Sequence, residues 1–244
     1  MHFDSGNQQL HSLGASAEQF AAPHATDFPA GTGDPPMLWL FRQVRKPSGP
    51  LGRRVVRAMN LTHATMTDWA LQQVTLPKDA VVLDVGCGRG RTVQKLAALA
   101  PEGKVVGLDY SAATVAISRD MNAQQIEAGR VRVAQGSVAA LPFLDRTFDI
   151  VTAVETHYYW PDLANNVREI LRVLKPGGTF ALIAETYRGG PFGMLYGIVM
   201  PVLPAAFLSD AEHRDLLAQA GFSEVVTKHV SGKNWICATG RRPA

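Results

Sequence analysis

Residues 81–90 read Val-Val-Leu-Asp-Val-Gly-Cys-Gly-Arg-Gly, and this stretch constrains the fold more than any other part of the chain. Its first five residues form the short apolar run of a buried strand. The glycines that follow permit a sharp turn and allow a ligand to approach the backbone closely. Because a strand, a glycine turn and a helix start in succession, we expect a ligand at the carboxyl end of a sheet.

The same alternation of short apolar runs and helical segments continues outward from this loop. The pattern predicts strands at 104–108, 131–134, 148–154 and 179–184, and helices at 91–100, 112–128 and 162–174. Such alternation indicates a parallel sheet with helices on both faces. A helix at 210–220 and strands at 224–230 and 234–239 follow, and the last two indicate a hairpin that adds an antiparallel edge.

The spacing of the glycines distinguishes between types of nucleotide ligand. A dinucleotide fingerprint needs a small residue at the position that Arg91 occupies, and the Lys-Ser/Thr pair of a phosphate-binding P-loop is absent. Asp84 places a negative charge where a diphosphate would be repelled, which favours a cationic ligand. Asp109 ends the second strand, where a carboxylate can accept hydrogen bonds from ribose hydroxyls. Together these residues favour an adenosyl ligand without a diphosphate.

Five motifs in order resemble those of the class I S-adenosylmethionine-dependent methyltransferases, in the type 11 branch that includes the ubiquinone and menaquinone C-methyltransferases. They are residues 84–90, 107–111, 141–143, 148–151 and 171–178. The resemblance implies a single α/β domain with a Rossmann-like, seven-stranded, mostly parallel sheet in the order 3-2-1-4-5-7-6. It also implies helices on both faces and a helical cap at the N-terminus.

The resemblance assigns a set of residues to S-adenosylmethionine and its product S-adenosylhomocysteine. Asp84 and the glycines would hold the methionine part, Asp109 the ribose, and Tyr110 the adenine face. Ser137 stands where the family usually has an aspartate for the adenine amino group, so we expect weaker cofactor binding. We expect Cys87 to pack rather than to react. The expected cofactor residues are Asp84, Gly86, Cys87, Gly88, Gly90, Asp109, Tyr110, Ser137 and Val138.

The loop after the fourth strand is expected to face the methyl acceptor. His157 is the candidate base because an unperturbed histidine titrates near neutral pH, and the alternative is a structural histidine bonded to the backbone. Glu155 either faces the cofactor amine or caps the loop. Residues 189–208 contain no charged side chain and suggest an apolar lid over the acceptor. The expected acceptor-binding residues are Tyr158, Tyr159, Trp160, Met194 and Tyr196.

The composition and length of the 244-residue chain limit its class and its division into segments. Hydrophobic residues make up 46% and charged residues 18%, which is typical of a globular core. We divide the chain into a weakly ordered arm (1–36), a helical cap (37–79) and the methyltransferase domain (80–244), with a lid insertion at 187–209. Two cysteines and the spacing of the histidines predict neither a disulfide framework nor a metal site. Residues 1–14 carry no secretory pattern, so we expect a cytoplasmic protein.

The charge is concentrated in one segment. Residues 35–67 carry six basic and no acidic side chains, while the formal net charge of the whole chain is +3. This argues against a broad nucleic-acid-binding face and leaves open a peripheral membrane contact. The predicted function is methyl transfer to O, C or N of a small, apolar or aromatic acceptor. The alternatives are a non-catalytic S-adenosylmethionine-binding module and an RNA or protein methyltransferase.

Overall fold

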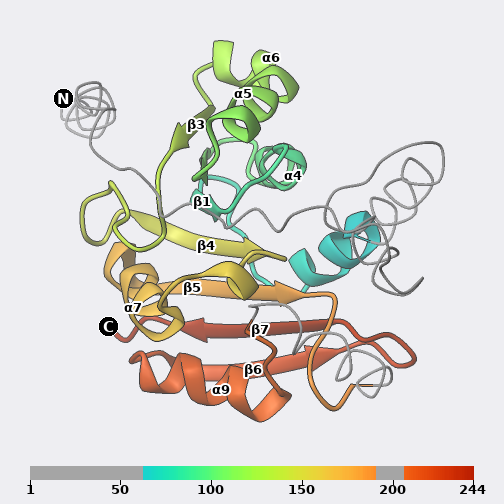
Figure 1. Cartoon of the computed structure of the whole chain (residues 1–244). Helices are drawn as coiled ribbons and strands as arrows, with labels where there is room; N and C mark the ends of the chain where they lie inside the picture. The colour runs from blue at the N-terminus through green and yellow to red at the C-terminus, as the bar shows by residue number, and fades with distance from the viewer. Residues whose placement is uncertain (1–62, 191–205) are drawn as a thin grey trace, which may run out of the picture. The chain divides into compact units, whose positions relative to one another are not determined.

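The computed structural model describes residues 63–190 and 206–244 (Figure 1). Contacts divide the chain into two units, Met1–Asn60 and Leu61–Ala244, and all of the described residues belong to the second. The arm, the cap up to residue 62 and most of the lid therefore lie outside the described residues. Within the described residues, no helix is both long enough and apolar enough to span a bilayer.

Seven strands form one sheet in the order β3-β2-β1-β4-β5-β7-β6, which confirms the expected order. Neighbouring strands are parallel from β3 to β5, and β7 pairs antiparallel with both β5 and β6. The order reverses direction between β1 and β4, and ligands bind at such a switch point, beyond the carboxyl ends of the strands. The strands are β1 Val81–Val85, β2 Lys104–Asp109, β3 Val131–Gln135, β4 Phe148–Val154, β5 Leu174–Ala184, β6 Ser223–His229 and β7 Ile236–Arg241.

Helices cover both faces of the sheet, as the alternating pattern predicts (Figure 1). Successive side chains of a strand point to opposite faces, so Leu83 packs into one hydrophobic cluster and Val82 into the other. The Leu83 cluster is covered by α7 (Leu163–Val173) and α9 (Asp210–Gln219). The Val82 cluster is covered by α4 (Arg91–Leu99), α5 (Ala112–Met121) and a helix over residues 63–71.

The helix predicted at 112–128 is two helices, α5 and α6 (Ala123–Glu127), so the prediction of one continuous helix is wrong. The break falls at Asn122, whose buried side-chain amide donates hydrogen bonds to the carbonyls of Gly90 and Ser118. A side chain that satisfies the backbone of a distant loop competes with regular helical geometry. The break therefore ties α5 to the glycine loop.

Strand β5 begins at Leu174, five residues before the predicted start at residue 179. Leu174 pairs with Phe148 and Thr179 pairs with Ile150, so residues 175–178 form an irregularity in the strand rather than the turn that Lys-Pro-Gly-Gly suggests. Lys175 is held there by Asp149, with the two Nζ–Oδ distances both 2.8 Å. The C-terminal helix and hairpin follow the prediction, and α9 starts at a Ser209–Glu212 capping box.

Candidate cofactor and acceptor site

The glycine loop is folded back onto the end of β2. The amides of Gly86 and Cys87 both donate to the Leu108 carbonyl, at 2.7 and 2.9 Å, and the Gly88 amide donates to Asp109 Oδ2 at 3.0 Å. Gly86 and Gly88 have φ of 73° and 54°, a region that favours glycine. A Cβ on Gly86 would overlap the Thr156 side chain, whereas among the described residues a Cβ on Gly88 would meet nothing closer than 4.0 Å. The described residues therefore leave the space over Gly88 open to a ligand.

Gly88→Ala is expected to lower the affinity for S-adenosylhomocysteine about tenfold or more, because the new methyl group would occupy this open space. The matched control is Gly129→Ala. Gly129 also has positive φ (68°), a Cβ on it would meet no atom of the described residues within 4 Å, and it precedes β3 at the opposite edge of the sheet. Both variants should lose about 1 kcal/mol of stability from the backbone conformation. Calorimetric titration checks the prediction, and equal affinities in the two variants would contradict it.

Asp109, only 7% exposed, organises the ends of β2 and β3. Besides its bond to Gly88, its Oδ1 accepts a hydrogen bond from the Ser111 amide at 3.0 Å, and Ser111 caps α5. The Gly136 amide donates to the Asp109 carbonyl at 2.9 Å, and the Gln135 side chain donates to the Tyr110 carbonyl at 3.0 Å. These bonds bring the predicted adenosyl-binding residues of two strands to one edge.

The predicted adenine contacts differ in exposure. Tyr110 is 73% exposed, so its ring is accessible to a ligand. Ser137 is exposed, and its hydroxyl accepts a hydrogen bond from the Ala139 amide at 3.2 Å, while Val138 is buried. Cys87 is buried too, and burial raises the pKa of its thiol to about 12. A thiol of that pKa stays protonated at neutral pH, as expected of a packing residue.

Asp84 is a buried carboxyl group, 1% exposed, at the centre of the sheet edge. The Thr152 hydroxyl of β4 donates to its Oδ1 at 2.6 Å. Burial raises the pKa of Asp84 to about 7, and the nearby charge of Asp109 adds to this shift. A cationic group bound beside it would favour the ionised carboxylate, whereas a phosphate would oppose it.

His157, the predicted base, lies in the short helix η1 (His157–Tyr159) and is fully buried. Within the described residues neither of its ring nitrogens has a hydrogen-bond partner, and its ring packs 4.2 Å from that of Tyr158 and 5.5 Å from that of His213. Burial lowers the pKa of His157 to about 3. The side chain is therefore neutral at pH 7. The alternative, a structural histidine bonded to the backbone, is not supported either, because no described backbone group bonds to the ring. Its role as a base stays a prediction that this burial does not favour.

The aromatic residues of the same loop point in different directions. Tyr158 and Trp160 are buried, with Tyr158 donating to the Thr186 carbonyl at 3.2 Å and Trp160 donating to Thr156 Oγ1 at 3.1 Å. Tyr159 is exposed. Met194 and Tyr196, the other predicted acceptor contacts, lie outside the described residues.

A cluster of three titratable side chains lies where β4 and β5 end. Glu155 follows β4, Glu185 follows β5, and the helix at residues 63–71 contributes His63. One ligand-type atom from each lies within 4.8 Å of the others, and His63 Nε2 is 2.7 Å from Glu185 Oε2. The sequence prediction included Glu155 and missed Glu185. His63 is a polar group in a mostly apolar helical segment, and the sequence alone left open whether it faces the pocket or lies at the surface. Glu185 could have been found from the sequence, because it directly follows a predicted strand, just as Glu155 does.

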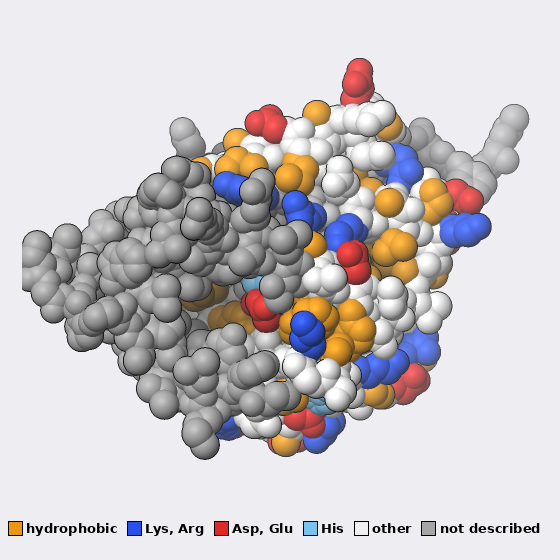
Figure 2. All heavy atoms as spheres, turned by 90° about the vertical axis from the view of Figure 1, so that its right-hand side faces the viewer, with side chains coloured by type: hydrophobic (Ala, Val, Ile, Leu, Met, Phe, Trp, Pro, Cys, Tyr) orange, Lys and Arg blue, Asp and Glu red, His pale blue; other side chains and the backbone are white. Residues whose placement is uncertain are grey.

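The carboxyl edge of the sheet, where this cluster and the glycine loop lie, faces the viewer in Figure 2. In Figure 1 the arrowheads of β4 and β5 point toward that side. Hydrophobic side chains lie between acidic and basic ones over the described part of this face in Figure 2. The part of this edge that Figure 2 shows for the described residues is thus mixed in character rather than of one charge.

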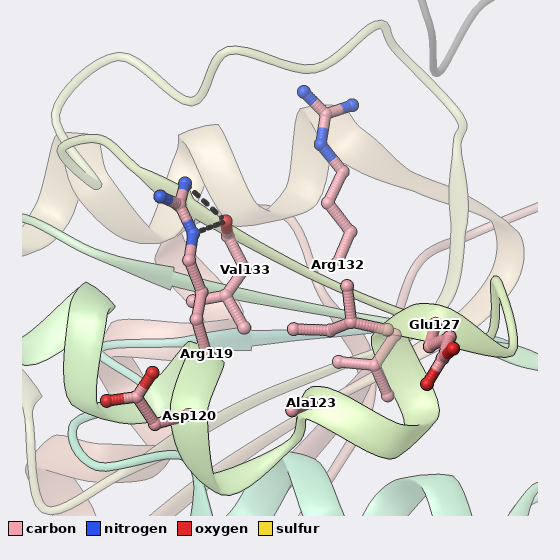
Figure 3. Close-up of a pocket in the computed structure, with 8 residues that line it drawn as sticks. Arg119, Asp120, Ala123, Glu127, Arg132 and Val133 are labelled. Carbon is pink, nitrogen blue, oxygen red and sulfur yellow. Dashed lines mark hydrogen bonds between the residues drawn. The ribbon is translucent and has the colours of Figure 1, made fainter.

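A separate depression lies beside the edge strand β3 and helices α5 and α6 (Figure 3). One side is formed by Arg119, whose guanidinium donates to the Val133 carbonyl at 3.0 and 3.1 Å. It is lined by residues from the first half of β3, whereas the glycine loop meets the carboxyl ends of the strands. This depression brings together none of the predicted site residues.

Comparison with known proteins supports a methyltransferase domain around the glycine loop. Residues 82–178 match the family described as "Methyltransferase domain". A demethylmenaquinone methyltransferase of Lactiplantibacillus plantarum is 39% identical over 131 residues, which cover 53% of this chain and 55% of that protein. The uncharacterized methyltransferase YdaC of Bacillus subtilis is 25% identical over 191 residues, 76% of this chain and 96% of that protein.

Solved structures share the fold. The S-adenosylmethionine-dependent methyltransferase SibL, in its apo form, superposes with a TM-score of 0.68 at 21% identity, covering 81% of this chain and 60% of that one. Residues 82–178, which match the methyltransferase domain family, contain the glycine loop, Asp84, Asp109 and the motif that ends at Gly178. These residues therefore belong to the methyltransferase domain family, and the chain is similar to S-adenosylmethionine-dependent methyltransferases of class I.

Proposed function

We propose that this protein transfers the methyl group of S-adenosylmethionine to a small, apolar or aromatic acceptor. The observation that carries the proposal is the pair of acidic side chains around the glycine loop. Asp84 is buried at the end of β1, Asp109 ends β2, and the space over Gly88 between them is open. Two carboxyl groups at a nucleotide loop suit a cationic adenosyl compound better than a diphosphate.

The residues present fit that compound chemically. Asp84 would face the positively charged methionine part, Asp109 would accept hydrogen bonds from the ribose, and exposed Tyr110 would offer its ring to the adenine. Ser137 would contribute a hydroxyl to the adenine amino group, without the charge of an aspartate. S-adenosylmethionine supplies an electrophilic methyl group, so the protein's main task is to align the acceptor with it.

An aromatic hydroxylated acceptor such as a quinol is supported by the relatives named demethylmenaquinone methyltransferases. The uncharged stretch at residues 189–208 is consistent with an apolar molecule. Because the alignment spans only 55% of the Lactiplantibacillus protein, the acceptor of that protein is a starting point for a search.

Turnover tests this proposal directly. The full chain would be incubated with S-adenosylmethionine and 1,4-dihydroxynaphthalene under reducing conditions, and S-adenosylhomocysteine and methylated product would be measured by mass spectrometry. We expect equal amounts of both products, lost in Asp109→Ala and retained in Glu102→Ala, an exposed carboxylate at the other end of β2. Binding of the cofactor without turnover would instead favour a non-catalytic module for this acceptor class.

A further inference from the structure

The cluster of His63, Glu155 and Glu185 is held together by the pairing of β4 with β5. The Glu155 amide donates to the Ile183 carbonyl at 3.0 Å, and the Glu185 amide donates to Glu155 Oε1. Glu155 has φ of 58°, an unfavourable conformation for a side chain of this kind, and such strain often occurs at functional sites. Tyr158 donates to the same Glu155 oxygen at 3.4 Å. These bonds fix the Glu155 carboxyl group against the backbone of Glu185, and an oxygen of each carboxyl group lies within 4.8 Å of the other.

The cluster adjoins the predicted cofactor loop. Thr156, the neighbour of Glu155, packs so closely on Gly86 that a Cβ there would overlap it. Thr152, three residues before Glu155, bonds to Asp84. Unlike His157, the His63 side chain is 33% exposed and that of Glu185 is 25% exposed. The His63 side chain is therefore partly accessible beside the predicted cofactor loop.

Building on the proposed function, we propose that His63 is the general base of methyl transfer, that Glu185 positions it, and that the acceptor carries an ionisable hydroxyl group. In this arrangement the His63 Nε2–H donates to Glu185 Oε2, which leaves the lone pair on Nδ1. Among the described residues, the His63 ring has no other hydrogen-bond partner. A phenol, quinol or enol hydroxyl would donate its proton to this nitrogen.

The step balances without any further reactant. The hydroxyl proton moves to His63 Nδ1, and the electron pair left on the acceptor forms the new bond to the methyl carbon. The bond between that carbon and sulfur breaks, and its electrons neutralise the sulfonium. If a ring carbon is methylated, that carbon then loses its own proton to solvent and the hydroxyl is regained from the imidazolium.

The charges around His63 support a base at this place. The hydrogen bond to Glu185 raises the pKa of His63 above its ordinary value of 6.5, and the charge of Glu155 acts in the same direction. Burial raises the pKa of Glu155 to about 7. A metal ion fits the cluster less well, because two ligands of a tetrahedral zinc site are about 3.3 Å apart. The 2.7 Å between His63 and Glu185 is a hydrogen-bond distance instead.

The experiment compares variants in the turnover assay with 1,4-dihydroxynaphthalene and, as a probe without hydroxyl groups, its dimethyl ether. His63→Gln and Glu185→Gln remove the pair. The matched control is His229→Gln, since His229 and Asp210 also lie 2.7 Å apart, with side chains 33% and 28% exposed, and His229 ends β6, two strands from β5. Calorimetry with S-adenosylhomocysteine shows whether each variant keeps the folded cofactor site.

We expect His63→Gln to lower kcat a hundredfold or more while the affinity for S-adenosylhomocysteine changes less than threefold. His229→Gln should match the wild type, and the dimethyl ether should not react. In Glu185→Gln the rise of kcat with pH should move to lower pH, because the carboxylate that raises the pKa of His63 is gone. Millimolar imidazole should restore part of the activity of His63→Ala, which a purely structural role would not allow.

Several results would overturn the inference, and they differ from a failure of the proposed function. If the wild type turns over the probe and the kcat of His63→Gln lies within threefold of the wild-type value, His63 is not the base, although the protein still transfers the methyl group. Turnover that EDTA abolishes and Zn²⁺ restores would replace the base by a metal centre. Cofactor binding without wild-type turnover of the hydroxylated probe would contradict this acceptor chemistry. Absence of S-adenosylmethionine binding would contradict the proposed function itself.

Discussion

Asp84→Asn is expected to stabilise the protein at pH 8 and, at the same time, to weaken S-adenosylmethionine binding about a hundredfold or more. Burial raises the pKa of Asp84 to about 7 in the folded protein, compared with an ordinary value of 3.8. Between these values the folded protein keeps a proton that the unfolded chain has released. The stability that Asp84 contributes is therefore complete below about pH 4 and is lost as the pH rises through 7.

Asparagine has no such dependence and can still accept the hydrogen bond from Thr152. The free energy of unfolding of Asp84→Asn minus that of the wild type should therefore be larger at pH 8 than at pH 4, by on the order of 2–4 kcal/mol. Urea unfolding of both proteins at pH 4 and pH 8 measures this difference. Glu155 has a similarly raised pKa, but it is present in both proteins and cancels.

The loss of binding in Asp84→Asn has a separate cause. The variant keeps the shape of the site and removes the negative charge that would face the methionine part of the ligand. Binding to the wild type should strengthen from pH 6 to pH 8 as Asp84 ionises, and binding to the variant should not. An unchanged affinity in the variant would show that Asp84 does not face the ligand. A variant less stable than the wild type at pH 8 would show that the buried charge of Asp84 does not destabilise the folded protein.

Asp109→Ala is expected to lower the affinity for S-adenosylhomocysteine more than a hundredfold and to cost about 2–4 kcal/mol of stability. Its two carboxylate oxygens accept hydrogen bonds from the Gly88 and Ser111 amides, and charge-assisted bonds of this kind are stronger than neutral ones. Asp109→Asn keeps one acceptor oxygen, so its loss of stability should be smaller. Thermal unfolding and calorimetry measure the two effects.

A ligand without the 2′-hydroxyl separates a direct contact from a general collapse of the loop. 2′-Deoxyadenosylhomocysteine should bind the wild type more weakly than S-adenosylhomocysteine does, and Asp109→Ala should not distinguish between the two ligands. If the variant discriminates as strongly as the wild type, Asp109 does not contact the ribose. Glu102→Ala, which changes an exposed carboxylate before β2, should behave as the wild type in both titrations.

The strand order and the glycine loop could be predicted because their signals are local. An apolar run followed by closely spaced glycines specifies a strand and a turn, whatever the rest of the chain does. The break at Asn122 could not be predicted, since its cause is a bond to the carbonyl of Gly90, far away in sequence. Propensity favours one helix there, and the tertiary contact overrides it.

The acceptor side was harder to predict for the same reason. His63 and Glu185 lie in distant parts of the sequence, and only the folded chain places them 2.7 Å apart. His157 begins an aromatic stretch that is expected to face the acceptor, yet its side chain is fully buried between Tyr158 and His213. Burial of a single side chain depends on what packs over it, and the local sequence carries no signal for that.

The most direct test of the cofactor assignment is calorimetric titration of the full chain with S-adenosylmethionine, S-adenosylhomocysteine and NAD. The arrangement of Asp84, Asp109 and the open space over Gly88 predicts binding of the first two at micromolar concentration, loss of both in Asp84→Asn, and no binding of NAD. Binding of NAD, or binding of S-adenosylmethionine that Asp84→Asn leaves unchanged, would contradict it.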